Sequence, residues 1–390
     1  MIDIYELDAD GQELVQSARE LARSVLVPAA AGVDTDARFP EECIRALGEQ
    51  GFLGLCIDTQ SGGQGQPPRV FAAVVEELAQ ACASTAMIYV MHVTATGAIA
   101  NSSLSASQGR LLEDIAAGNH LTTIAFSERG SRSQFWAPVS ALRKHDSETG
   151  WTISAEKAWV TSAGHADSFV SSAQRTGAES PMESTLFLVR REQAGVSIGD
   201  RFDGLGLRGN DSTPVILEDV SVATDHLLSA QGAGTETMLT KVLPWFLVGT
   251  AAMANGLCRA AVRQTADHLA EAGFENNGSK LRDLPTLRAR LAEMSVRTEQ
   301  SRALLSTSVR SLDEPQEETP LYLLQSRLAA VEAGQHVTEL AMLACGGAAF
   351  SKHLPIERMF RDARAGCVMA PTADHLREFI GRATLGLSLF

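Results

Sequence analysis

The hydrophobic pattern of this 390-residue chain changes twice, and these two changes constrain the fold more than any single motif. Apolar residues recur at helical spacing up to about residue 119. From His120 to about residue 230, short alternating or β-branched runs are separated by turn residues, which is typical of strands. Helical spacing then returns and continues to the end. The order predicts an α+β protein with an N-terminal helical domain (1–119), a central small β-barrel or sandwich domain (120–230) and a C-terminal four-helix-type bundle (231–390).

Local signals place the first helices. Asp10 and Glu13 have the spacing of a capping box, and the apolar period that follows predicts a helix that ends at Pro28. A second helix should begin at Pro40, because proline suits a first helical position, and end before Gly51. Three more helices are expected at 68–83, 86–101 and 105–117.

The remaining elements follow from the same periods. Strands are expected at 121–127, 139–144, 151–155, 168–173, 185–189 and 213–222. Helices are expected at 234–272, 284–312, 318–345, 355–364 and 372–384. Pro244 should kink the first of these helices, because proline removes a backbone hydrogen bond.

Composition limits the possible partners and the compartment. The net charge is −14 and the isoelectric point is near 5.1, which argues against a nucleic-acid or anionic-membrane partner. The apolar runs are shorter than a membrane span. Six scattered cysteines form no CxxC pair, so we expect reduced thiols and a cytoplasmic protein.

Several kinds of catalytic centre lack their sequence signals. A serine hydrolase needs a G-x-S-x-G elbow, and a zinc enzyme commonly carries clustered ligands such as H-E-x-x-H; neither pattern is present. No G-x-G-x-x-G follows a strand in a βαβ unit, which argues against a Rossmann domain. We therefore expect no metal, and a nucleotide cofactor would need another architecture.

The stretch from Ile124 to Ser162 has the chemistry of a cofactor site. An apolar strand leads into Ser-Glu-Arg-Gly-Ser-Arg-Ser at 127–133, and Trp159 and Thr161 follow some thirty residues later. Small hydroxyls and open backbone N–H groups suit phosphates, and an indole face suits a planar ring. The alternative is a polar turn beside an ordinary tryptophan of the barrel.

Six segments in this order resemble motifs of the acyl-CoA dehydrogenase flavoprotein family. Residues 51–65 resemble its "GLLG…P…GG.G" turn, 127–133 its "TEPxAGSD", 157–162 its "KxWITN", 207–222 its "GxRxSxT…FxDVxVP", 345–350 its "FGGxGF" and 355–364 its "PxERxxRDAR". Each motif is weak alone, but their shared order and spacing cover nearly the whole chain. The resemblance implies two helical domains around a small β domain, assembled as a homodimer or homotetramer, or with a related chain.

The resemblance also implies FAD, lying between the β domain and the C-terminal bundle. The backbone of Phe126 and the hydroxyl of Ser127 would meet the flavin pyrimidine edge, and Ser133 the phosphates. Trp159 would pack against the ring and Thr161 would bond near N5. Gly347 would lie against the adenosine of a neighbouring subunit's cofactor, and Thr372 near the adenosine phosphate.

The family reaction oxidises an acyl thioester, carried on CoA or on an acyl-carrier protein, at its α and β carbons. A carboxylate takes the α proton, and the β hydrogen leaves as hydride to flavin N5. The electrons then pass to an electron-transfer flavoprotein or to O₂.

The usual catalytic glutamate is missing from this sequence. Ala370 occupies its position after "RDAR", and an apolar residue near Phe246 occupies the alternative position that some relatives use. His92 is a candidate base, because it lies on the helix that lines the acyl pocket in the family and imidazole titrates near neutral pH. A lone histidine among apolar residues is more often a core residue.

Cofactor contacts from across the subunit interface are also altered. The family's "RxxFG" aligns with Phe274–Gly278, so its arginine is lost, and Leu343 replaces a glutamine. Arg132 stands where the family has glycine, beside Ser133, and we expect it to supply the lost charge within the same chain. The alternative is that Arg129 and Arg132 only decorate a solvated loop.

Three functions remain open at this point. The first is a flavin-dependent oxidoreductase on an unusual thioester, with a relocated base. The second is a flavin monooxygenase on a non-thioester substrate. The third is a non-catalytic partner subunit that completes the site of a glutamate-bearing homologue.

Overall fold

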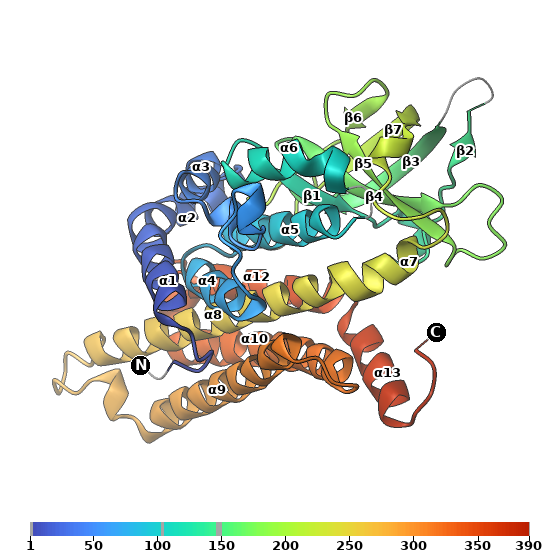
Figure 1. The fold of residues 1–390 in the computed structure, drawn as a ribbon. Coiled ribbons are helices and arrows are strands. Elements are labelled where there is room, and N and C mark those ends of the chain that lie inside the picture. Colours follow the sequence, from blue (N-terminus) through green and yellow to red (C-terminus); the bar gives the residue numbers. More distant parts are fainter. Residues whose placement is uncertain (1–2, 103–104, 146–149, 390) are drawn as a thin grey trace.

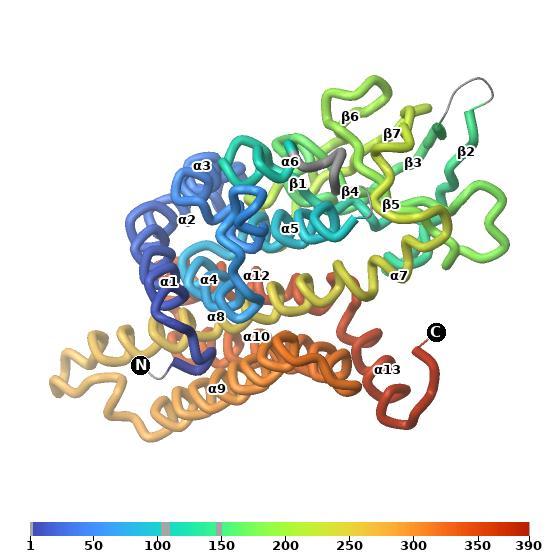
Figure 2. The backbone as a smooth tube through the Cα atoms, viewed as in Figure 1, coloured from blue at the N-terminus to red at the C-terminus, as the bar shows by residue number. Residues whose placement is uncertain are grey.

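The computed structural model describes residues 3–102, 105–145 and 150–389, and it has the predicted order of helices, strands and helices (Figure 1). The tube in Figure 2 follows the chain from the N-terminal helices into the strands, and then back beneath them into the long C-terminal helices. The acidic chain thus forms an α+β fold, as predicted. The domain limits at 119/120 and 230/231 stay a prediction.

The N-terminal helices agree with the sequence analysis except at one cap and one proline. They are α1 (Ala9–Leu21), α2 (Val27–Thr35), α3 (Glu41–Glu49), α4 (Pro68–Ala81), α5 (Ala83–Ala100) and α6 (Ser105–Ala116). The cap of α1 is Asp8, whose carboxylate accepts the N–H of Gly11 at 2.8 Å, so the prediction of Asp10 was wrong. Pro28 does not end the helix, because a π-turn (Ala22–Leu26) places it in the first turn of α2.

The strands form two sheets. They are β1 (Thr122–Ala125), β2 (Arg143–Lys144), β3 (Trp151–Val160), β4 (Ser168–Gln174), β5 (Ser184–Arg190), β6 (Val196–Ile198) and β7 (Thr213–Val222). One sheet has the order β1-β4-β5, with β1 parallel to β4, and the other has the order β2-β3-β7-β6. The sequence analysis did not predict β6, which has only three residues and too short a pattern to recognise. It ended β3 at Ala155 instead of Val160, because bulges interrupt the alternation of that strand.

Three long helices and four shorter ones, α7 to α13, follow the strands in the described chain. After α7 (Gly234–Thr237) and a π-turn (Met238–Val242) come α8 (Leu243–Glu271), α9 (Pro285–Asp313), α10 (Thr319–Cys345), α11 (Gly347–Phe350), α12 (Ile356–Val368) and α13 (Ala373–Thr384). The π-turn interrupts the single helix predicted over 234–272, and Pro244 lies in the first turn of α8. The kink predicted at Pro244 stays a prediction. The long helices pack on one another below the strands (Figure 1).

Helix α5 lies at the centre, between the β1–β4–β5 sheet and α8 (Figure 1). By length and composition alone, α5 and the stretch Gly234–Glu271 could each cross a membrane, which the sequence analysis did not recognise. In the fold, however, 89% of the apolar window in α5 and 56% of that in the second stretch are buried. Packing within the protein accounts for the apolar composition of α5.

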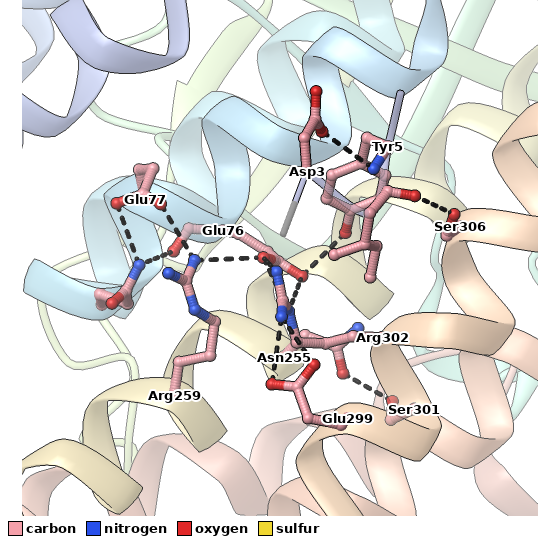
Figure 3. Close-up of polar contacts among 12 residues, drawn as sticks. Asp3, Tyr5, Glu76, Glu77, Asn255, Arg259, Glu299, Ser301, Arg302 and Ser306 are labelled. Atoms are coloured by element: carbon pink, nitrogen blue, oxygen red, sulfur yellow. Dashed lines mark hydrogen bonds and ion pairs between the residues drawn. The ribbon is translucent and has the colours of Figure 1, made fainter. Parts of the chain in front are cut away.

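A buried polar network joins the N-terminal helices to the C-terminal bundle (Figure 3). Glu76 on α4 accepts hydrogen bonds from the Tyr5 hydroxyl at 2.8 Å and from the Arg302 guanidinium on α9 at 3.2 Å. Arg259 on α8 bridges Glu76 and Glu77 at 3.2 and 3.0 Å. Because buried carboxylates are costly unless paired, these contacts specify how α4 sits on the bundle.

A second junction joins all three parts of the chain through the "RDAR" segment of α12. Arg361 binds both carboxylate oxygens of Asp34 on α2 and donates to the carbonyl of Leu205 at 3.0 Å. The neighbouring Asp362 accepts the N–H of Leu207 at 2.6 Å. This motif therefore locks the loop before β7 and the N-terminal helices onto the bundle.

Replacing Asp362 tests this junction through pH. Burial raises the pKa of Asp362 to about 6, so the folded protein holds its proton more tightly than the unfolded chain does. The contribution of Asp362 thus favours folding at low pH and is lost as the pH rises through about 6. Asp362→Asn keeps an acceptor for Leu207. We expect it to gain about 3 kcal/mol of stability relative to wild type between pH 4 and pH 7, measured by urea unfolding. A difference that does not vary with pH would contradict the raised pKa.

Candidate functional site

A buried ion pair joins the two halves of the predicted cofactor segment. The ammonium of Lys157 on β3 lies 2.6 Å from a carboxylate oxygen of Glu128, and both side chains are buried. Next to this pair, the N–H of Ala158 donates to the carbonyl of Ser127 at 2.8 Å. The hydroxyl-rich turn after β1 is therefore attached directly to the strand that carries Trp159.

The Glu128 carboxylate organises the turn further. It accepts the N–H groups of Val139 and Ser140 at 2.7 and 2.9 Å, as well as the hydroxyl of Ser140 at 2.5 Å. Burial acts to raise the pKa of Glu128, but the Lys157 ammonium and these donors outweigh it and hold the pKa below its usual range. The carboxylate therefore stays charged and closes the loop over 128–140.

The predicted cofactor hydroxyls are available for a ligand. Ser127 and Ser133 are half-buried and Thr161 is buried, yet none of the three hydroxyls makes a hydrogen bond to another described residue. Ser133 and Arg132 both have left-handed backbone conformations, with φ of 70° and 48°. Arg132 is exposed and forms no ion pair within the described chain. Such open donors suit phosphate oxygens.

Trp159 is presented at the surface by a bulge in β3. The register between β3 and β7 shifts between Lys157 and Val160, and Trp159 has a φ of 58°. Its side chain is 62% exposed, and the ring stacks on Phe202 with centroids 4.0 Å apart. An exposed indole is unusual for a core tryptophan, so the structure favours a ligand-facing role over the barrel-core alternative.

Aromatic contacts bring α13 to the same turn. Trp136, three residues after Ser133, packs edge-on against His375 and Phe379 of α13, with centroids 5.5 Å apart in both pairs. Thr372 caps this helix, its hydroxyl accepting the N–H of His375 at 3.3 Å. The predicted phosphate residues Ser133 and Thr372 thus belong to segments that pack on each other.

Gly347 lies apart from these contacts, at the start of α11. It is exposed, and a Cβ added there would meet nothing within 4 Å. The neighbouring Leu343 and Phe350 are 55% and 83% exposed. This open apolar end of the bundle is compatible with the predicted contact to another subunit's cofactor, but the chain does not bring it to Ser133 itself.

The structure favours a core role for His92 over the predicted role as a base. His92 is fully buried; its Nδ1 accepts the N–H of Thr122 at 3.1 Å, and its Nε2 lies 3.1 Å from the carbonyl of Leu53. Nδ1 must be unprotonated to accept, so Nε2 carries the proton and donates. Burial lowers the pKa of His92 to about 4, and neither nitrogen is open to a substrate. Ala370 and Phe246, at the two family positions for the base, are both half-buried and cannot accept a proton.

A separate surface cavity of about 400 Å³ lies near the start of α3. It is lined by charged side chains around Phe39 and His165, whose rings stack 3.8 Å apart. None of the predicted cofactor residues lines it, so we assign it no role in cofactor binding.

Sequence reasoning missed the groups that hold the site together. Lys157 lies in a strand-like segment, where a buried cation requires a partner, and this could have marked it as paired. Glu128 lies in a polar turn and carried no such signal. Trp136 and His375 had no comparable signal, because only tertiary packing brings them together.

Comparisons with known proteins point to one family along nearly the whole chain. Residues 8–119, 123–220 and 232–385 match models of the N-terminal, middle and C-terminal domains of acyl-CoA dehydrogenase. The chain is 29% identical over 380 residues to the short-chain specific mitochondrial acyl-CoA dehydrogenase of Sus scrofa, covering 96% of this chain and 90% of that protein. It is 25% identical over 388 residues to the probable acyl-CoA dehydrogenase fadE25 of Mycobacterium leprae, covering 99% and 98%.

Solved structures share the fold at lower identity. Butyryl-CoA dehydrogenase from Megasphaera elsdenii superposes with a TM-score of 0.92 at 21% identity, covering 97% of this chain and 99% of that one. The FAD complex of PigA superposes with a TM-score of 0.90 at 19% identity, covering 98% and 99%. These likenesses show the architecture of two helical parts around a β part.

Breaking the buried ion pair should destabilise the protein. Lys157→Met leaves the Glu128 carboxylate buried without a cation, and we expect a loss of about 3–5 kcal/mol in urea unfolding. The double variant Lys157→Met/Glu128→Gln removes both charges and should recover part of that loss. Equal stability of the single and double variants would show that the two residues are not coupled.

Proposed function

Because this chain belongs to the acyl-CoA dehydrogenase family of flavin oxidoreductases that act on CH–CH groups, we propose that it binds FAD and oxidises an acyl thioester between its α and β carbons. The observation that carries the proposal is the set of unpartnered hydroxyls beside an exposed tryptophan. Ser127, Thr161 and Trp159 come from two segments that Lys157 and Glu128 tie together.

The described residues fit the cofactor. Thr161 is only 3% exposed, and its hydroxyl makes no hydrogen bond to another described residue, so the group is free to bond a ligand. In the proposal, Phe126, Ser127 and Thr161 hold the flavin ring, Trp159 packs against it, and Ser133 and Thr372 meet its phosphates. Gly347 serves the cofactor of another subunit in a homodimer or homotetramer. FAD, when bound, accepts the hydride from the β carbon.

Neither of the two positions expected for the catalytic base, 246 and 370, carries a residue that can remove the α proton. The protein must hold the thioester carbonyl so that negative charge can develop on its oxygen, and a base must take the proton. Ala370 and Phe246 offer no acceptor, and His92 is occupied by backbone groups. We propose a base that differs from both family positions.

The missing proton acceptor at positions 246 and 370 also supports other candidate functions. Without a carboxylate at position 370, a flavin monooxygenase that activates O₂ on a non-thioester substrate needs no α-proton acceptor. A non-catalytic subunit that pairs with a glutamate-bearing relative needs none either. In these two cases apolar residues at positions 246 and 370 are compatible with the function.

One measurement separates these functions. The visible spectrum of the purified homomer should show bound flavin, and an anaerobic acyl-CoA thioester should bleach it. Bound flavin that thioesters never bleach, combined with O₂ consumption driven by free reduced flavin, would favour the monooxygenase. A colourless homomer that gains flavin only beside a homologous subunit would favour the partner-subunit function.

We further propose that Arg132 supplies positive charge to the FAD phosphates from within the chain. The Arg132 side chain is exposed, forms no ion pair with a described carboxylate, and stands next to Ser133 in a left-handed turn. Phe274, at the position of the family's cross-subunit arginine, is 40% exposed and carries no charge. A charge-assisted contact from Arg132 would therefore replace the one that the arginine at position 274 makes in the family.

Substitution of two arginines in one turn tests this role. A charge-assisted contact contributes about 1.5–3 kcal/mol, so Arg132→Ala should weaken FAD binding by about 10- to 150-fold. Arg129→Ala, the matched control, removes an exposed arginine three residues earlier and should leave FAD affinity unchanged. Both are measured by titrating apoprotein with FAD and with riboflavin, which lacks phosphate. Equal effects of both variants would mean that net charge, rather than a contact, matters.

The partners follow from the same proposal. We propose an acyl group on CoA or a carrier protein as substrate, an electron-transfer flavoprotein or O₂ as electron acceptor, and a cytoplasmic location. Neither nucleic acid nor a membrane is required.

A further inference from the structure

We propose that Phe202 is a positioning residue for the cofactor: it covers one face of the Trp159 indole and leaves the opposite face to the flavin ring. This inference rests on the proposed function, and it adds which face of Trp159 meets the cofactor and what holds the indole there. Phe202 lies in the loop between β6 and β7, outside every motif that the sequence analysis recognised.

The first observation is the stacking of the two rings. The ring centroids of Trp159 and Phe202 are 4.0 Å apart, and the ring planes differ by 21°. In this near-parallel arrangement one face of each ring is in van der Waals contact with the other. Trp159 is nevertheless 62% exposed, while Phe202 is half-buried. An indole that is covered on one face and still largely exposed presents its other face to a planar ligand.

The second observation is that the strand fixes the backbone of Trp159 but not its ring. The N–H of Ala158 donates to the carbonyl of Ser127 at 2.8 Å, and the bulge gives Trp159 a φ of 58°. These features set where the side chain leaves the strand. Rotation about the side-chain torsions stays free unless a neighbour packs against the ring, and ordering a free ring on binding costs entropy. Phe202 supplies the packing that restricts this rotation before a ligand arrives.

The third observation is that the loop carrying Phe202 is itself held. Arg208 donates to the carbonyl of Gly204 at 3.1 Å, and Arg361 of α12 donates to the carbonyl of Leu205 at 3.0 Å. Both bonds are made to the backbone, so they do not depend on which side chains the loop carries. Phe202 is therefore presented from a supported segment, and its ring can act as a fixed backing for the indole.

Replacing Phe202 should first change the apoprotein. Phe202→Ala removes the stacked ring, so we expect the near-ultraviolet circular dichroism of Trp159 to be lost and its fluorescence to be quenched more strongly by acrylamide. The contribution of Trp159 is isolated from those of the other three tryptophans by subtracting the spectrum of Trp159→Phe. Phe202→Tyr keeps an aromatic ring and should retain both signals of the wild type.

The same substitution should weaken flavin binding through the ring. A stacked aromatic pair contributes about 0.5–1.5 kcal/mol, so Phe202→Ala should raise the dissociation constants of FAD and riboflavin alike by about 2- to 12-fold. Loss of a phosphate contact would affect FAD and spare riboflavin. Phe202→Tyr should restore the affinity. In a Trp159→Leu background, Phe202→Ala should add no further loss, because the two residues act as one unit.

The matched control is Leu205→Ala. Leu205 is an apolar residue of the same loop and is 64% exposed, and its carbonyl still accepts from Arg361 after the substitution. We expect it to leave both the spectra and the flavin affinities unchanged. If Phe202→Ala does not fold, Phe202→Leu, which is apolar but has no flat ring, replaces it in every arm.

Two results would overturn the inference alone. Wild-type affinity for flavin in Phe202→Ala, or an unchanged apoprotein spectrum, would show that Phe202 does not position the indole. Tighter flavin binding by Phe202→Ala would show that Phe202 competes with the flavin for the same face of Trp159. A wild-type protein that binds neither FAD nor riboflavin would instead overturn the proposed function, and this inference with it.

Discussion

The buried Glu128–Lys157 pair is the interaction on which the candidate site depends. It joins a turn rich in hydroxyls to the strand that presents Trp159, and its carboxylate also holds the backbone of Val139 and Ser140. Two buried charges are stable only when their hydrogen bonds are satisfied, so the pair imposes one geometry on both segments. Ser127, Ser133 and Thr161 can then remain without protein partners and available to a cofactor.

Two further charged junctions explain how the site lies between helices and strands. Glu76 ties α4 to α8 and α9, while Arg361 and Asp362 tie α12 to α2 and to the loop before β7. The "RDAR" segment resembles a family motif, and in the fold its Arg361 and Asp362 join α12 to α2 and to the loop before β7. These buried charges fix how the helices and this loop pack together.

The two sides of the candidate site differ in what they retain. On the flavin side, open hydroxyls and an exposed indole are present. Among the residues predicted to meet the substrate, Ala370 and Phe246 are apolar, and His92 is held by two backbone groups. The proposed site thus keeps polar and aromatic groups for a flavin and lacks a proton acceptor at both predicted positions of the base.

The amino-acid sequence by itself determined the order of helices and strands, most of their limits and the family, because hydrophobic period and short motifs are local properties. It located Ser127, Ser133, Trp159 and Thr161 by their motifs. It could not decide that Asp8 rather than Asp10 caps α1, that Pro28 continues a helix through a π-turn, or that His92 is held on both nitrogens. Only the tertiary structure decided these points, and also the pairing of Glu128 with Lys157 and the packing of Trp136 on His375. Each of these contacts is made with a residue or backbone group that is distant in the sequence or set by tertiary packing, and a local sequence pattern does not specify it.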